Sequence, residues 1–404
     1  MTDREMPGEP LEDEPFEPWP GRVWPMASML AVLCAIGFAV RFRATSLPLF
    51  LDEAATLLAA QQIGKSGLPI LPSGVLYLHG ATVSYLLAPL GHWGLLDIAN
   101  VEKLRLLNVI IGTVAIPLAY LIGKRASGSA VVGLFAALLV AIDPVSALWG
   151  TYLRMYAMLE TTSALFVLAF LSVAMVSPRE VRSGWLVALV VAYWLAVFSH
   201  LTGALLLPAA ALTAIGLFGR ELLGPRRGLT VALAGCLLGL VAFLCLTRLL
   251  SAGGGASVLA DRTIPGVGFV GDQLIDLSRL LSPSTVLLQE AFGGFPFGET
   301  ISVLIPALSG VVAGCWLVTA APPGPRHSSA IVIALGWIPL AGISFLVSAA
   351  AERYAMVSVA TLLVLTAWGI WLIRPRLQDR RTAGWVIRGA TVAALIGLLL
   401  TRDL

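Results

Sequence analysis

The hydrophobic residues of this chain occur in long, almost uninterrupted runs, and short charged segments separate one run from the next. A helix needs about 20 apolar residues to cross a ~30 Å hydrocarbon core, which is close to the length of these runs. About eleven of them can be recognised on this criterion: 24–41, 104–123, 130–149, 157–176, 185–199, 202–218, 229–250, 301–320, 330–348, 355–373 and 385–400. The pattern predicts an all-α protein, a polytopic transmembrane helical bundle.

The composition agrees with this prediction. Of the 404 residues, 58% are hydrophobic and 12% are charged, and the charged fraction is about half of that in soluble domains. Residues 1–22 differ from the rest because they are acidic and rich in proline, which is typical of a disordered tail and unlike the basic start of a signal peptide. We therefore expect a disordered cytoplasmic tail at 1–22 and one transmembrane domain over 23–404.

The distribution of Lys and Arg indicates the orientation, because the cytoplasmic loops of membrane proteins are enriched in both. Segment 79–96 is long enough to cross the membrane but contains Gly, Pro and polar residues. If it does not cross, the short basic loops all lie on the side of the N-terminus, which is then cytoplasmic. We expect a multi-pass cell-membrane protein with two long outside loops, 44–103 and 251–300. The first loop is predicted to carry surface helices near 52–65 and 79–94.

Charge and cysteine content exclude two further classes of site. The net charge is +3 and the basic residues are scattered, which argues against a nucleic-acid partner. All four cysteines (Cys34, Cys236, Cys245 and Cys315) fall inside apolar runs, where a free cysteine behaves as a small hydrophobe. We therefore expect neither a disulfide nor a zinc cluster.

Ionisable side chains gather at the predicted outer ends of the spans, and the middle of the membrane is nearly free of charge. An ion-coupled transporter would place relay residues at mid-depth, so this distribution favours a site at the outer interface. The candidate residues are Asp52, Glu53, His79, Arg105, Tyr152, Arg154, Tyr156, Glu160, His200, Glu352, Arg353 and Tyr354.

Asp52 and Glu53 follow the first span directly, and the pair has two interpretations. Carboxylates in the first turn of a helix interact favourably with its dipole and need no catalytic role. A carboxylate beside a low-dielectric surface can instead act as a general base that accepts a proton from an alcohol.

Two arginine and tyrosine pairs, Arg154 with Tyr156 and Arg353 with Tyr354, lie at the predicted outer ends of different spans. Each pair could be an interfacial anchor in the aromatic belt of a membrane protein. Phosphate binding would explain both pairs, because guanidinium binds phosphate oxygens in a forked geometry. Ion pairs of Arg353 with Glu352 and of Arg154 with Glu160 are the structural alternative.

Two histidines are further candidates. His200 lies in a tight turn between two spans, where the backbone can satisfy it. His79 could bind phosphate or a metal, or cap the second surface helix. Asp52, Glu53, His79 and His200 could together hold a divalent metal, but no metal-binding spacing supports such a site, and the metal requirement stays open.

Several of these residues form a recognisable set. It comprises Asp52 with Glu53, the Tyr77 to Gly91 segment, Arg105 ahead of Gly123-Lys124-Arg125, the Leu153-Arg154-Met155-Tyr156-Ala157 motif, and Arg353 with Tyr354. The set resembles the membrane glycosyltransferases of the GT-C fold that use polyprenyl-phosphate sugars, which include protein O-mannosyltransferases and lipid A aminoarabinose transferases. The resemblance covers residues 40–220, with a shorter match near 350–372, and the Arg-Met-Tyr-Ala stretch is its most specific element.

The resemblance implies an enzyme that transfers a sugar from a polyprenyl-phosphate donor to a lipid, glycan or protein acceptor at the outer face of the membrane. The family's first-loop carboxylate, a base or metal ligand, corresponds to Asp52, with Glu53 adjacent. Arg154 and Arg353 would bind the donor phosphate, with Tyr156, Tyr354 and His79 beside it. A nucleotide-sugar donor is disfavoured because the chain has neither an Asp-X-Asp motif nor a P-loop.

Two other functions remain open at this point. A lipid or polysaccharide flippase or polymerase would lack this active site, so convergence of Asp52, Arg154 and Arg353 in one outward cavity would argue against it. A noncatalytic assembly partner would show a large apolar lateral patch and no polar cavity.

Overall fold

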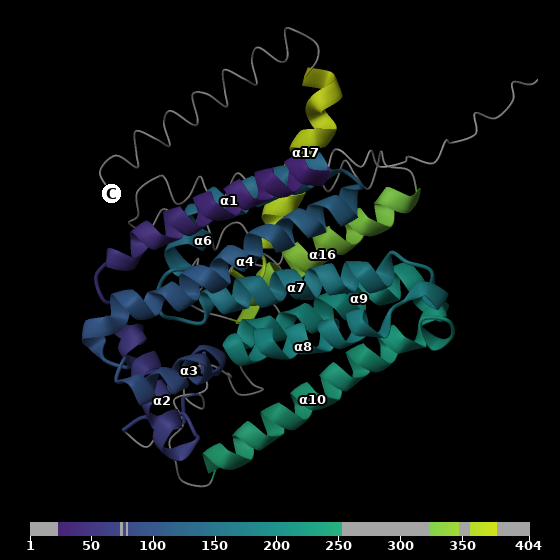
Figure 1. Ribbon diagram of the computed structural model, residues 1–404. Coiled ribbons are helices and arrows are strands. Elements are labelled where there is room, and N and C mark those ends of the chain that lie inside the picture. Colours follow the sequence, from purple (N-terminus) through teal and green to yellow (C-terminus); the bar gives the residue numbers. More distant parts are fainter. Residues whose placement is uncertain (1–22, 73–75, 78–79, 253–322, 347–355, 378–404) are drawn as a thin grey trace, which may run out of the picture.

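The computed structural model describes residues 23–72, 76–77, 80–252, 323–346 and 356–377, and within these ranges the chain is helical (Figure 1). No β-strand occurs in them apart from one isolated bridge between Ile70 and Leu76. The α-helices are α1 (Val23–Arg43), α2 (Leu51–Ser66), α3 (Ala81–Leu87), α4 (Val101–Ser127), α5 (Ala130–Ile142), α6 (Pro144–Trp149), α7 (Tyr156–Ala174), α8 (Ser183–Ser199), α9 (Leu206–Phe218), α10 (Arg227–Ala252), α16 (Pro323–Leu346) and α17 (Val359–Leu377).

Five segments in the described part are long and apolar enough to cross a membrane: Met26–Ser46, Ile98–Ser127, Tyr156–Ala174, Leu201–Leu223 and Arg227–Leu246. Shorter apolar helices occupy Ala130–Ile142, Ser183–Ser199, His327–Leu340 and Val359–Trp371. The all-helical, membrane-embedded class is therefore confirmed. The predicted spans 301–320 and 385–400 lie outside the described residues, so the total of about eleven stays a prediction.

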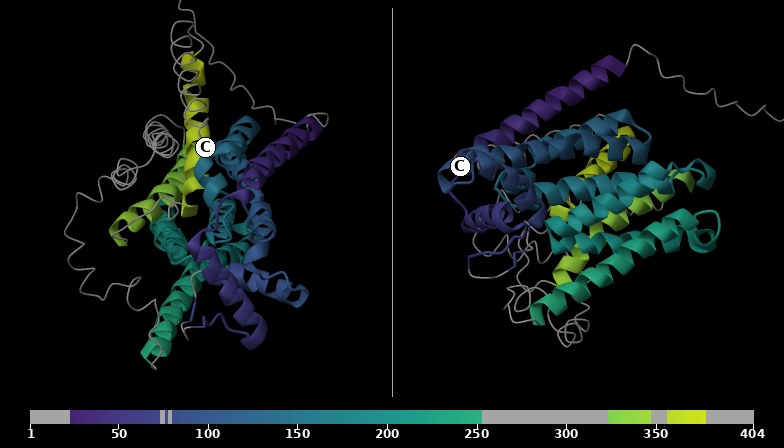
Figure 2. Two further views of the ribbon diagram at one scale, coloured as in Figure 1. Left: turned by 90° about the vertical axis from the view of Figure 1, so that its left-hand side faces the viewer. Right: turned by 60° about the horizontal axis from the view of Figure 1, so that its bottom comes forward.

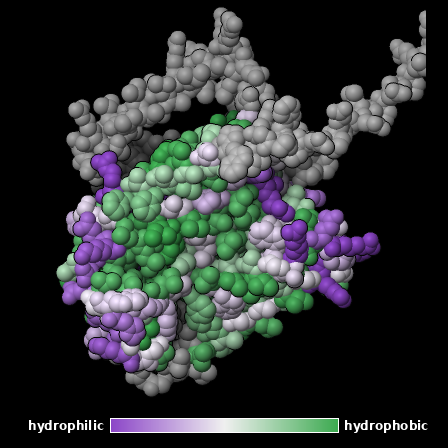
Figure 3. Space-filling model, viewed as in Figure 1, coloured by the Kyte–Doolittle hydropathy of each residue, from purple (hydrophilic) through white to green (hydrophobic). Residues whose placement is uncertain are grey.

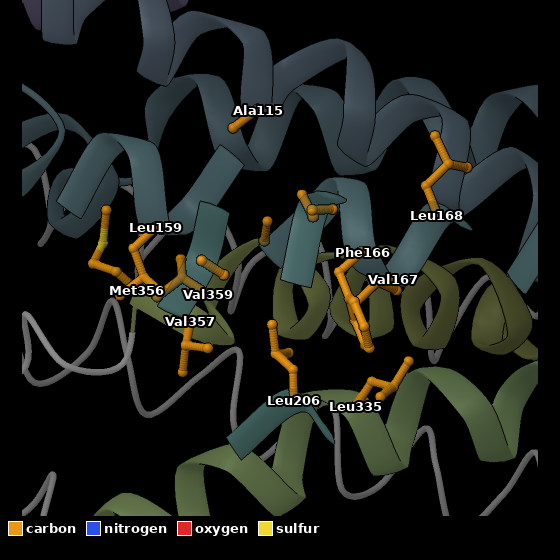
Figure 4. Close-up of a cluster of buried hydrophobic side chains, with 14 of the residues drawn as sticks. Ala115, Leu159, Phe166, Val167, Leu168, Leu206, Leu335, Met356, Val357 and Val359 are labelled. Carbon is orange, nitrogen blue, oxygen red and sulfur yellow. The ribbon is translucent and has the colours of Figure 1, made fainter. Parts of the chain in front are cut away.

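Helix α7 forms the centre of the bundle. In its most apolar stretch 83% of the residues are buried, against 11% for α1 and 17% for α10. Helices α1 and α10 lie on opposite sides of the bundle in both figures (Figures 1 and 2). Phe166 and Val167 of α7 belong to the same buried cluster as Leu206 of α9, Leu335 of α16 and Val359 of α17 (Figure 4).

Small residues allow α4 and α5 to pack closely. A Cβ atom at Gly133 would lie 2.6 Å from the backbone oxygen of Tyr120, which no side chain can tolerate. Close backbone approach at glycine is a common device of transmembrane helix pairs, where van der Waals packing replaces the hydrophobic effect. This contact fixes α5 beside α4, the helix that carries Arg105 and Asn108.

The predicted continuous span over 130–149 is wrong, because the chain breaks at Asp143 into α5 and α6. Asp143 has an extended backbone (φ −63°, ψ 122°), and its carboxylate accepts a hydrogen bond from the amide of Ser146 at 2.7 Å. A proline follows at the first position of α6, and proline disfavours helical geometry in the residue before it. The chain therefore turns here, ahead of the segment that carries Arg154.

One end of the bundle is built from short helices. α2 agrees with the predicted surface helix near 52–65, and α3 together with a 3₁₀ helix, η3 (Ala88–Trp93), occupies most of the predicted 79–94. α3 has 7 residues, far fewer than the ~20 needed to cross a membrane. Hydrophilic side chains gather at two ends of the molecule with an apolar band between them (Figure 3).

Candidate active site at the start of helix α2

Asp52 and Glu53 lie together in the first turn of α2, but they do not face the same way. Pro48 follows the end of α1, and the extended Phe50 precedes α2. Successive residues of an α-helix are rotated by about 100°, because 3.6 residues make one turn. The two neighbouring carboxylates therefore enter different surroundings, and each has its own arginine.

The Glu53 carboxylate is completely buried and saturated with hydrogen bonds. Its Oε1 accepts from Arg105 Nε at 2.9 Å and from the Leu153 amide at 2.6 Å. Its Oε2 accepts from Arg105 Nη2 at 2.6 Å and from the Phe50 amide at 2.8 Å. The bond from Phe50 caps the N-terminus of α2. For Glu53, this agrees with the interpretation of the acidic pair as a helix N-terminus.

Arg105 of α4 is equally occupied. Besides its two bonds to Glu53, its Nη1 donates to the carbonyls of Thr45 and Leu47, and its Nη2 donates to the carbonyl of Pro48 at 3.0 Å. A guanidinium has five N–H groups, so all of its donors are used. The Glu53–Arg105 pair thus joins α2, α4 and the connection between α1 and α2.

The Asp52 carboxylate is far more accessible. Its Oδ2 lies 3.2 Å from Nη2 of Arg154, and the Asp52 side chain is 42% exposed whereas that of Arg154 is 7% exposed. Arg154 Nη1 also donates to the backbone oxygen of Asp52 at 3.1 Å and to the hydroxyl of Tyr77. Within the described residues Arg154 Nε has no hydrogen-bond partner. The predicted ion pair of Arg154 with Glu160 is wrong, because Arg154 pairs with Asp52 instead.

The loop that carries Arg154, residues 150–155, is held against α4 by a residue that the sequence did not single out. Asn108 is completely buried, and its Nδ2 donates to the carbonyls of Tyr152 and Arg154. It lies three residues after Arg105, on the same face of α4. A second polar side chain in an otherwise apolar span, one turn from an arginine, is the signal that could have identified it.

Aromatic rings pack on and beside this loop. Tyr152 lies against Phe50 and Trp149, with ring centroids 5.5 Å and 5.6 Å away, and Tyr156 lies 5.5 Å from Trp149. The Arg105 guanidinium stands 5.2 Å from the Tyr152 ring. Burial raises the pKa of Tyr152, and the charge of Arg105 opposes that rise. Tyr152 therefore stays protonated at neutral pH.

His200 acts as a helix cap in the structure. Its Nδ1 accepts from the amide of Thr202 at 3.2 Å and lies 2.8 Å from the Thr202 hydroxyl, at the start of η6 (Leu201–Leu205). The ring is buried and its centroid is 6.1 Å from that of Tyr156. This geometry agrees with the interpretation of His200 as a turn histidine.

Four predicted site residues, His79, Glu352, Arg353 and Tyr354, lie outside the described residues. Within the described ranges no three His, Cys, Asp or Glu side chains come close enough together to hold a metal ion. Glu53 has no oxygen left for a metal, because Arg105 and two backbone amides occupy both of its oxygens. The metal requirement therefore depends on Asp52 and on residues outside the described part.

Comparison with solved structures establishes the fold. The chain is similar to ArnT from Cupriavidus metallidurans bound to undecaprenyl phosphate, at 15% identity and a TM-score of 0.60, over 94% of this chain and 65% of that one. It is also similar to the oligosaccharyltransferase AglB from Archaeoglobus fulgidus in complex with an inhibitory peptide and a dolichol-phosphate, at 15% identity and a TM-score of 0.59, over 95% and 55% of the two chains. The chain has the GT-C fold.

Both neighbours are glycosyltransferases, and the predicted resemblance is confirmed at the level of the fold. The chain spans less than two thirds of the length of either neighbour. No protein-family model matches the sequence, and no curated protein matches it.

Proposed function

We propose that this protein is a membrane glycosyltransferase that moves a sugar from a polyprenyl-phosphate donor to an acceptor at the outer face of the membrane. The observation that carries the proposal is the Asp52–Arg154 pair, which brings a partly exposed carboxylate to within 3.2 Å of a guanidinium at one end of a GT-C fold. One group can take a proton and the other can hold a phosphate. The two solved neighbours, which bind undecaprenyl phosphate and dolichol-phosphate, support a lipid-phosphate donor.

The chemistry needs both charges. An acceptor hydroxyl or amine attacks the anomeric carbon of the donor sugar, the bond from that carbon to the phosphate oxygen breaks, and its electron pair leaves with the polyprenyl phosphate. Asp52 takes the acceptor proton as general base. Arg154 stabilises the leaving phosphate by forked hydrogen bonds, and Arg353 and His79 are proposed to do so from the residues outside the described part.

In the structure, before any donor binds, Asp52 and Arg154 contact each other. A donor phosphate that recruits Arg154 would leave the Asp52 carboxylate with fewer contacts and free to meet the acceptor. Arg154 Nε, without a partner among the described residues, is a further donor for that phosphate.

We also propose that this end of the bundle faces outward. Its short helices follow the first span, whereas the basic pairs Lys124 with Arg125, in the last turn of α4, and Arg226 with Arg227, at the start of α10, lie at the other ends of the spans. A cysteine introduced at Ser66 should react with a membrane-impermeant maleimide from outside, and one at Ser127 should not. The reverse pattern would refute this orientation.

The transfer itself can be tested before the sugar is identified. Deletion of the gene should cause the donor, a polyprenyl-phosphate sugar, to accumulate in the membrane. The purified protein, given that extracted lipid and membranes of the deletion strain, should release polyprenyl phosphate and transfer the sugar to the membranes. If no polyprenyl-linked sugar accumulates and none is consumed, the proposal is wrong.

The flippase or polymerase interpretation is less well supported. It predicts no convergence of an outward carboxylate and an arginine, and the structure brings Asp52 and Arg154 together. Arg353, the third member of the predicted convergence, lies outside the described residues.

A further inference from the structure

A second group of buried ionisable side chains lies outside the candidate active site. Arg41, near the end of α1, and Glu160 of α7 are completely buried, and Asp143 is nearly so. The guanidinium interacts electrostatically with both carboxylates. Burial of charged groups is costly even where opposite charges face each other, so their presence in a membrane bundle calls for a role. We name Arg41, Asp143 and Glu160 the buried triad.

Hydrogen bonds connect the buried triad to both ends of one segment of chain. The hydroxyl of Ser146, in α6, donates to Glu160 Oε1, in α7, and so closes residues 147–159 into a loop. The amide of the same serine donates to Asp143 Oδ2 at 2.7 Å. The hydroxyl of Thr151 donates to the backbone oxygen of Arg41 at 3.1 Å. Each member of the triad therefore contacts the segment or its ends.

The closed segment is the one that delivers residues to the candidate active site. Within it, the Leu153 amide donates to Glu53 and Arg154 contacts Asp52. The α2 carboxylates hold loop 150–155 from one side, and the buried triad holds the chain on either side of it. α6 has 6 residues, and a helix this short has little stability of its own. The geometry of Arg154 therefore depends on these tertiary contacts.

The bundle is shaped to accommodate the triad's guanidinium. Arg41 donates to the backbone oxygen of Gly37, on its own helix, and to that of Val140, on α5, both at 3.2 Å. A Cβ atom at Gly112 of α4 would lie 3.2 Å from Arg41 Nε, which is tighter than an ordinary contact. Within the described residues Arg41 Nε and Glu160 Oε2 have no hydrogen-bond partner, so the Ser146–Glu160 bond is the hydrogen bond that joins Glu160 to the loop.

We propose that the buried triad, acting through the hydrogen bond between Ser146 and Glu160, is a positioning device that holds loop 150–155 so that Arg154 faces Asp52 before a donor binds. The benefit to donor binding rests on the proposed function, whereas the restraint on the loop does not. Groups that bind a charged ligand work best when their supports fix them in advance. Loss of the support lowers the fraction of binding-competent molecules and weakens the apparent affinity by the same factor.

The test compares Ser146→Ala with Ser163→Ala. Ser163 is also buried, lies on α7, and its hydroxyl has no hydrogen-bond partner among the described residues, so it is a matched control. We measure amide hydrogen exchange in nanodiscs, and in parallel the affinity for undecaprenyl phosphate. Ser146→Ala should speed exchange at residues 152–154 by at least about tenfold and weaken lipid binding by a similar factor, because the lost bond ends on a carboxylate. Ser163→Ala should change neither.

The outcomes separate this inference from the proposed function. Exchange in loop 150–155 that is the same in both variants would overturn the positioning role, whatever the lipid binding shows. Exchange that rises throughout the bundle would also overturn it, because the hydroxyl would then contribute only to overall stability. Faster exchange confined to the loop, in a protein whose wild type does not bind undecaprenyl phosphate, would support the positioning role and refute the proposed donor.

Discussion

Asp52 and Glu53 are adjacent in sequence, identical in charge and paired with arginines, yet their surroundings differ in almost every respect. Glu53 is completely buried and accepts four hydrogen bonds, two of them from Arg105. The Asp52 side chain is 42% exposed and makes one ion pair, with Arg154. The Glu53–Arg105 pair uses all of its donors and acceptors, whereas Arg154 Nε of the Asp52–Arg154 pair has no hydrogen-bond partner among the described residues.

The difference arises because adjacent positions of a helix face in different directions. A carboxylate whose lone pairs are all occupied cannot take a proton from a substrate without breaking the contacts that hold α2 to α4. A half-exposed carboxylate such as that of Asp52 can, because part of it is open to solvent. Adjacency in the sequence therefore does not give both members of an acidic pair the same role, and each can be tested by its own substitution.

The largest effect on stability is expected from breaking the Glu53–Arg105 pair. Glu53→Ala leaves the Arg105 guanidinium buried without its partner, which should destabilise the protein by about 3 to 5 kcal/mol. The free energy of unfolding in a detergent titration measures this. Glu102→Ala, at an exposed position in the first turn of α4, is the control and should change little. A loss below about 1 kcal/mol for Glu53→Ala, as for a surface ion pair, would contradict the structural role.

The second-largest effect is expected at the Asp52–Arg154 pair. Arg154→Lys keeps the charge but removes the forked geometry that binds phosphate, so the affinity for polyprenyl phosphate should fall by at least about tenfold. The control is Arg226→Lys, since Arg226 also pairs with a partly exposed carboxylate, that of Glu221, at 3.0 Å. Unchanged lipid affinity together with a lower thermal midpoint would show that Arg154 is structural.

A smaller effect is expected from the hydroxyl that orients the arginine. Tyr77→Phe removes one of the two acceptors of Arg154 Nη1 and should weaken donor binding by about threefold to tenfold, the range of one hydrogen bond. Tyr85→Phe removes a hydroxyl that donates to the Gly67 carbonyl at 2.9 Å on an exposed tyrosine, and it should be neutral. Equal effects of the two substitutions would show that the Tyr77 hydroxyl does not orient Arg154 for donor binding.

The helices of the bundle could be predicted from the sequence, because periodicity and length decide where they form. Apart from 130–149, each predicted span in the described part is helical where the structure describes it, because an apolar run of this length has few alternatives in a bilayer. The exception is 130–149, where Asp143 and Pro144 break the helix, although that dipeptide is visible in the sequence. The local signal was outweighed by the continuous apolar run around it.

The candidate site was predicted only in part. Asp52, Arg105 and Arg154 were identified from their types and places, but the partner of each was not, because ion pairs 52 and 102 residues apart depend on tertiary packing. Asn108 and the triad member Arg41 were missed for the same reason. Their roles come from neighbours on other helices, which a single sequence does not specify.

The most direct test of the central claim, that Asp52 and not Glu53 performs the chemistry, compares Asp52→Asn with Glu53→Gln in one preparation. Sugar transfer per folded molecule and the free energy of unfolding are measured for both. Asp52→Asn should lose at least about 100-fold in turnover, the lower end for general base catalysis, while stability changes by no more than about 1 kcal/mol. Glu53→Gln should lose stability, with its folded fraction still active. An active Asp52→Asn beside a folded but inactive Glu53→Gln would contradict the account and assign the chemistry to Glu53.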